Sequence, residues 1–67
     1  MTGRITELID DQQFGTIAAE DGSNYVFHSR SLLDTKFGVL HVGAAVIFTP
    51  IYASGIRRAE AVRVLSK

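Results

Sequence analysis

Five short runs of strand-forming residues, separated by polar turn sequences, constrain the fold of this chain more than any other feature. The turn between the second and third runs contains Asp21-Gly22, a strong hairpin signal because both central residues can adopt positive φ. We therefore expect a small all-β domain in which the second and third strands pair as a hairpin. The strands are predicted at residues 3–9, 14–19, 24–28, 44–52 and 56–65.

The second half of the chain decides how the sheet ends. Residues 32–42 keep neither a strand nor a helix period, which predicts one long irregular connection between His28 and Ala44. Pro50 indicates a sheet edge or a bulge. The last run fits either a short helix or a strand with a bulge near Ala61, where its apolar face changes side. We favour the strand, since it would close the edge left open by the first four, and predict a five-stranded antiparallel Greek-key barrel.

The length and composition point to one domain that is held together by packing alone. The 67 residues predict a single domain over residues 1–67, and the absence of cysteine excludes disulfides and thiolate-bound zinc. No stretch approaches the length of a membrane span, and the N-terminus lacks the pattern of a signal peptide. We therefore expect a soluble, cytoplasmic protein without membrane contact.

The charged and glycine residues give no sign of an enzyme. Seven Lys and Arg balance seven Asp and Glu, so binding of a polyanion would depend on a local patch. The six glycines are dispersed and match neither a phosphate loop nor a dinucleotide motif. His28 and His41 have no acidic partners at metal-site spacing, and no nucleophile is paired with His28. We predict no catalysis, no metal and no cofactor.

Two short segments carry a recognisable pattern, Gln13-Phe14-Gly15-Thr16-Ile17 and Tyr25-Val26-Phe27-His28. They resemble the two RNA-binding motifs of the cold-shock domain family, Lys-Gly-Phe-Gly-Phe-Ile and Val-Phe-Val-His-Phe-Ser-Ala-Ile. The similarity spans nearly the whole chain, because four more fragments follow the family's order: Met1 to Ile5, Glu20-Asp21-Gly22, Leu40 and Gly43 before Val46 and Phe48, and Ala59 with Val62. The resemblance implies an OB-fold barrel that binds single-stranded RNA or DNA.

The departures from the family gather on its binding face. There the family uses aromatic side chains to stack unpaired bases, a contact worth about 1–3 kcal/mol per base. Four of these aromatics are replaced here, which at that scale removes roughly 4 kcal/mol or more and predicts weak, sequence-tolerant binding. Phe14 and His28 remain as stacking groups. The resemblance places on this face Glu7, Leu8, Phe14, Thr16, Val26, His28 and Ser29.

Each candidate contact residue also has an ordinary structural interpretation. Phe14 is either an exposed stacking ring or a core residue, and His28 either stacks on a base or is a plain surface residue. The arginines either converge on one side to contact phosphates or are scattered and solvated. The predicted nucleic-acid contacts are Phe14, His28, Arg4, Arg30, Arg57 and Arg58, and the predicted core includes Ile5, Ile17, Val46 and Phe48.

The alternative to nucleic-acid binding is a protein-interaction or self-association module on the same barrel. In that hypothesis Leu8, Val26 and Ile47 form an apolar patch for a protein partner or for a second copy in a homodimer. Nucleic-acid binding must weaken as salt rises, so a titration at two salt concentrations separates the two hypotheses.

Overall fold

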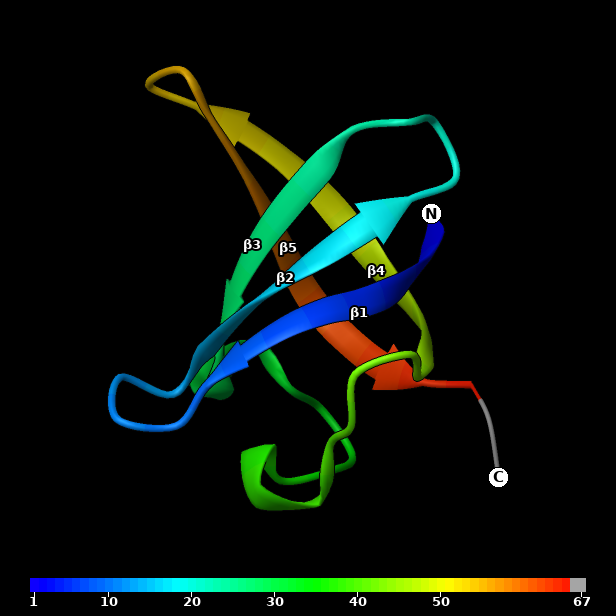
Figure 1. Ribbon diagram of the computed structural model, residues 1–67. Helices are drawn as coiled ribbons and strands as arrows, with labels where there is room; N and C mark the ends of the chain where they lie inside the picture. The colour runs from blue at the N-terminus through cyan, green and yellow to red at the C-terminus, as the bar shows by residue number, and fades with distance from the viewer. Residues whose placement is uncertain (66–67) are drawn as a thin grey trace.

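The computed structural model describes residues 1–65, so Ser66 and Lys67 of the predicted domain lie outside the described residues. Five strands form a closed, barrel-like ring in the order β1-β2-β3-β5-β4 (Figure 1). The predicted five-stranded all-β fold is confirmed, and each predicted strand end lies within one residue of the observed end. The strands are β1 (Thr2–Ile9), β2 (Phe14–Ala19), β3 (Asn24–His28), β4 (Ala45–Ala53) and β5 (Ile56–Val64).

One junction of the ring differs from the prediction. Neighbouring strands pair antiparallel except β3 and β5, which run parallel with Val26 opposite Arg58. The prediction of a wholly antiparallel sheet is therefore wrong at this junction. The cause is the long β3–β4 connection, which returns the chain across one end of the ring (Figure 1), so that β5 runs in the direction of β3.

The last segment is a strand with a bulge, as predicted. The pairing of β4 with β5 changes register between Ile47 and Thr49. Opposite this point Ala61 has φ of +52°, a left-handed conformation that absorbs the extra residue. Pro50 lies beyond Ile47, where the β1 pairing ends, which fits its predicted place at a sheet edge.

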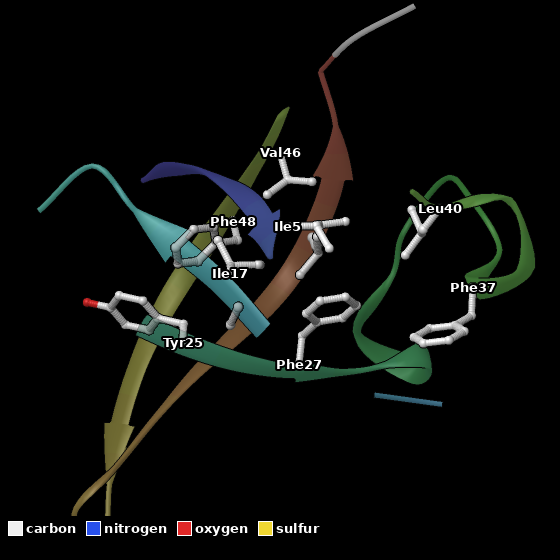
Figure 2. Packing of buried hydrophobic residues seen from close by; sticks show 10 residues of the cluster. Ile5, Ile17, Tyr25, Phe27, Phe37, Leu40, Val46 and Phe48 are labelled. Carbon is white, nitrogen blue, oxygen red and sulfur yellow. The ribbon is translucent and has the colours of Figure 1, made fainter. Parts of the chain in front are cut away.

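The core fills the inside of the ring (Figure 2). Ile5, Ile17, Val46 and Phe48 are buried, which confirms the predicted core. Tyr25 of β3 packs on Phe48 with ring centroids 5.1 Å apart.

The long β3–β4 segment is irregular, as predicted, but it also completes the core. It contains two short 3₁₀ turns, η1 (Ser29–Ser31) and η2 (Phe37–Val39). Phe37 and Leu40 are buried, and the Phe37 ring lies 6.3 Å from that of Phe27 (Figure 2). The segment therefore covers one end of the ring with apolar side chains.

Gly15 fixes which side of β2 faces outward. A Cβ atom on Gly15 would lie 2.6 Å from the Glu7 carbonyl oxygen and 2.9 Å from the Phe27 ring, so the residue points into the packed interior. Successive residues of a strand alternate between its faces. Phe14 and Thr16 must therefore lie on the outer face.

The turn at Asp21-Gly22 joins β2 and β3 as predicted, but with another geometry. Only Gly22 has positive φ, +85°, and Ala19 donates its N–H to Ser23 at 2.8 Å, which leaves a three-residue loop. The predicted hairpin is therefore confirmed, with one of the two residues at positive φ. Two consecutive residues with positive φ occur in the turn between β4 and β5, at Ser54 and Gly55, with φ of +55° and +76°.

Candidate nucleic-acid interface

Outward side chains form two adjoining rows across the sheet. In one row Glu7 of β1 lies opposite Thr16 of β2, Thr16 opposite Val26 of β3, and Val26 opposite Arg58 of β5. In the other row Ile9, Phe14 and His28 are paired across β1, β2 and β3. We call the surface formed by Glu7, Phe14, Thr16, Val26, His28 and Arg58 the binding face.

The two remaining stacking groups are direct neighbours. Phe14 begins β2 and His28 ends β3, and the two residues face each other in the antiparallel pairing. Glu7 and His28 are exposed and Phe14 and Thr16 are half-buried, so the predicted outward orientation of these four residues holds. A shallow groove of about 200 Å³ runs beside them and is lined by Phe14, Val26, His28, Arg58 and Glu60, among others.

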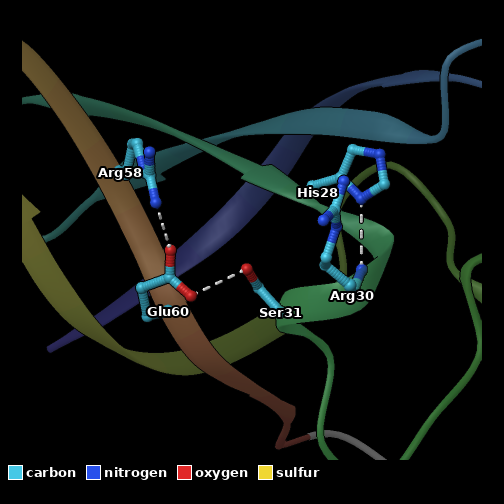
Figure 3. A network of polar contacts seen from close by, with 5 residues as sticks. All are labelled: His28, Arg30, Ser31, Arg58 and Glu60. Carbon is cyan, nitrogen blue, oxygen red and sulfur yellow. Dashed lines mark hydrogen bonds and ion pairs between the residues drawn. The ribbon is translucent and has the colours of Figure 1, made fainter.

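The His28 ring is oriented by its own backbone turn (Figure 3). The Arg30 backbone N–H donates to His28 Nδ1 at 3.2 Å, and Ser29 Oγ lies 3.4 Å from the same nitrogen. Because Nδ1 accepts a hydrogen bond, the neutral ring carries its proton on Nε2. The ring is thus held in place and remains exposed to solvent.

A polar network adjoins this pair, and two of its members were not predicted. Arg58 Nη2 donates to Glu60 Oε2 at 3.0 Å, and Ser31 Oγ donates to Glu60 Oε1 at 3.0 Å (Figure 3). The hydrogen bond from Arg58, reinforced by that from Ser31, holds the pKa of Glu60 below its usual range. The two-residue spacing of Arg58 and Glu60 on one strand could have predicted that they share a face. The contact with Ser31 had no signal in the sequence.

The four predicted arginines do not converge. Arg58 lies on the binding face, and Arg30 lies two residues after His28. Arg4 is opposite Ala18, at the far end of β2 from Phe14, and donates from Nη1 to the Gly43 carbonyl at 2.9 Å. Arg57 lies near the β4–β5 turn, with its guanidinium 5.3 Å from the centre of the Tyr52 ring.

The apolar patch of the alternative hypothesis does not form. Leu8 is paired with the inward Gly15 and packs against the core, so its predicted place on the binding face is wrong, because neighbouring strand residues face opposite ways. Ile47 is paired with Thr2 and Arg63, away from Val26. Ser29, also predicted on the face, is half-buried at the start of η1.

Comparisons with known proteins add no assignment: no protein-family model and no curated protein matches this chain. Among residues 1–65, the structure has no helix with the length and apolar character needed to cross a membrane. Within the same residues, no three His, Cys, Asp or Glu side chains gather as a metal site would require. A function for this chain is therefore inferred from the binding face itself.

Proposed function

We propose that this domain is a cold-shock-type OB-fold that binds single-stranded RNA or DNA weakly and with little sequence preference. The observation that carries the proposal is the direct pairing of Phe14 with His28 on an outer sheet face, with Arg58 in the adjoining row. The strand order β1-β2-β3-β5-β4 with one long connection supports a Greek-key barrel of the OB type. In this proposal the protein is cytoplasmic and has no catalytic activity.

The side chains of the binding face are better suited to stacking on bases than to recognising base edges by hydrogen bonds. The Phe14 ring is half-buried, and the His28 ring is oriented through Nδ1, so both can stack on a base at a low cost in conformational entropy. Arg58, in the adjoining row, and Arg30, two residues after His28, are the proposed cations for phosphates. Binding is weak because two rings replace a larger aromatic platform, and because Glu7 places a negative charge in the same row as Arg58.

A titration of fluorescent oligothymidine at low and moderate salt tests this function. The affinity should fall as salt rises, since phosphate contacts release counterions. Phe14→Ala should weaken binding by about 5- to 150-fold, the loss of one stacked base. Ile47→Ala, which truncates an exposed apolar side chain outside the face, is the matched control and should bind like the parent. Equal affinity of Phe14→Ala and the parent would reject the face as the site.

One observation favours the alternative, a protein-interaction or self-association module. Three apolar side chains near the tip of the β4–β5 hairpin are exposed: Ile51 by 38%, Tyr52 by 67% and Ile56 by 52%. The hairpin projects beyond the ring at the end opposite the β3–β4 segment (Figure 1). If this surface mediates self-association, sedimentation velocity will show a concentration-dependent dimer that Ile56→Asp abolishes. A monomer at all concentrations would argue against a homodimer.

A further inference from the structure

The ion pair between Arg58 and Glu60 has a consequence for the binding face. We propose that Glu60 competes with nucleic-acid phosphate for the Arg58 guanidinium, so that the chain carries its own attenuator of binding. This inference rests on the proposed function, because it concerns the same face and the same class of ligand. It assigns to Glu60 a role in setting affinity.

The Glu60 carboxylate is held from two sides. Arg58 Nη2 lies 3.0 Å from Oε2, and Ser31 Oγ donates to Oε1 at 3.0 Å. Ser31 is only 8% exposed and belongs to η1, so it anchors the carboxylate from an element other than β5. The Arg58 and Glu60 side chains remain 56% and 37% exposed, which leaves the pair open to an incoming phosphate (Figure 3).

The position of the pair makes the competition direct. Arg58 is opposite Val26 on the binding face, and Glu60 lines the groove beside Phe14 and His28. A phosphate that reaches Arg58 must either displace the carboxylate from Nη2 or bind the remaining N–H groups beside a like charge. Both routes cost free energy, so Arg58 contributes less to phosphate binding than an arginine without an ion pair would.

The size of the effect follows from the strength of exposed ion pairs. Such pairs contribute about 0.2–1 kcal/mol, so releasing Arg58 should tighten binding by up to about fivefold. The freed guanidinium can then neutralise one further phosphate. The slope of log K against log salt should therefore become steeper by about 0.7, the value for single strands.

A double-mutant cycle with fluorescent oligothymidine tests the proposal, using the parent, Glu60→Gln, Arg58→Ala and the double variant. Glu60→Gln should bind more tightly than the parent, and this gain should vanish when Arg58 is absent. Glu7→Gln is the matched control, since Glu7 lies in the same row as Arg58 and, among residues 1–65, forms no ion pair with an arginine. Its effect should be the same with and without Arg58.

Two outcomes of this mutant cycle would overturn the proposal. If Glu60→Gln also increases the affinity for oligothymidine in the Arg58→Ala background, Glu60 repels the phosphates directly and does not act by competing for Arg58. A loss of affinity in Glu60→Gln would show that the carboxylate itself contacts the nucleic acid. Ser31→Ala provides a second variant, because it releases the carboxylate from its anchor with both charges intact, and it should tighten binding by a smaller factor than Glu60→Gln.

A measurement without nucleic acid separates failure of this inference from failure of the proposed function. Inorganic phosphate is titrated into ¹⁵N-labelled parent and Glu60→Gln protein, and the side-chain resonances of Arg58 are followed. They should shift at lower phosphate concentration in Glu60→Gln, whereas equal responses would refute the competition. If no variant binds oligothymidine at low salt, the proposed function fails even where the phosphate titration supports competition for Arg58.

Discussion

Replacing Gly15 with Ala tests the strand register on which the binding face depends. The added Cβ would meet the Glu7 carbonyl oxygen at 2.6 Å and two atoms of the Phe27 ring at 2.9 Å. Neither neighbour can move freely, because the first belongs to the backbone of a paired strand and Phe27 is 3% exposed. Overpacking of this kind costs about 1–3 kcal/mol. For a domain of this size, each kcal/mol lowers Tm by about 4–8 °C, so a decrease of roughly 4–24 °C is expected.

Thermal unfolding followed by circular dichroism measures this effect. Gly38→Ala is the matched control, since no atom lies within 4 Å of its added Cβ and its φ is not in the left-handed region. Its stability should change by less than about 1 kcal/mol, in the stabilising direction where the backbone accepts alanine. If Gly15→Ala unfolds at the temperature of the parent, Gly15 does not face the core, and Phe14 and Thr16 lose their place on the outer face.

Two further predictions concern the binding face and its ion pair. Thr16→Phe should tighten oligothymidine binding by about 5- to 150-fold, because it adds one stacking ring in the row between Glu7 and Val26. Thr16→Ile adds apolar area without a π face and should change affinity little, so equal gains from both would contradict stacking. The two hydrogen bonds to Glu60 lower its pKa in the folded state. The stability that they contribute is therefore present when the pH is above the pKa of Glu60 in the unfolded chain, about 4.5. This stability is lost as the pH falls through the pKa of the folded state. The Tm difference between parent and Glu60→Gln should thus be a few degrees at pH 7 and shrink as the pH falls below about 4.5, and a difference independent of pH would refute this.

The features that the sequence could predict are those set by local patterns. Alternation of apolar residues and polar turns predicted the strand bounds, and the change of apolar side near Ala61 predicted its bulge. The outward positions of Phe14 and Thr16 follow from the same alternation, once Ile17 is assigned to the core. The same alternation excludes Leu8 from the face that holds Glu7. The resemblance placed both residues on that face, which neighbouring residues of one strand cannot share.

The features that the sequence could not predict depend on contacts between distant segments. Ser31 and Glu60 are 29 residues apart, and the parallel β3–β5 junction, together with the parallel bridge between Leu32 and Val62, brings them together. Phe37 belongs to a segment without periodicity, so its burial depends on how the long connection covers the end of the ring. The positions of Arg4 opposite Ala18 and of Arg57 opposite Tyr52 likewise follow from register.

The most direct test of the central claim is a map of backbone amide shifts in ¹⁵N-labelled protein during titration with oligothymidine. The claim that the Phe14–His28 face binds nucleic acid predicts that the largest shifts occur on this face. They should cluster at Phe14, Thr16, Val26, His28 and Arg58, which adjoin one another across β2, β3 and β5. Shifts confined to residues 51–57 at the β4–β5 hairpin, or no shifts at low salt, would contradict it.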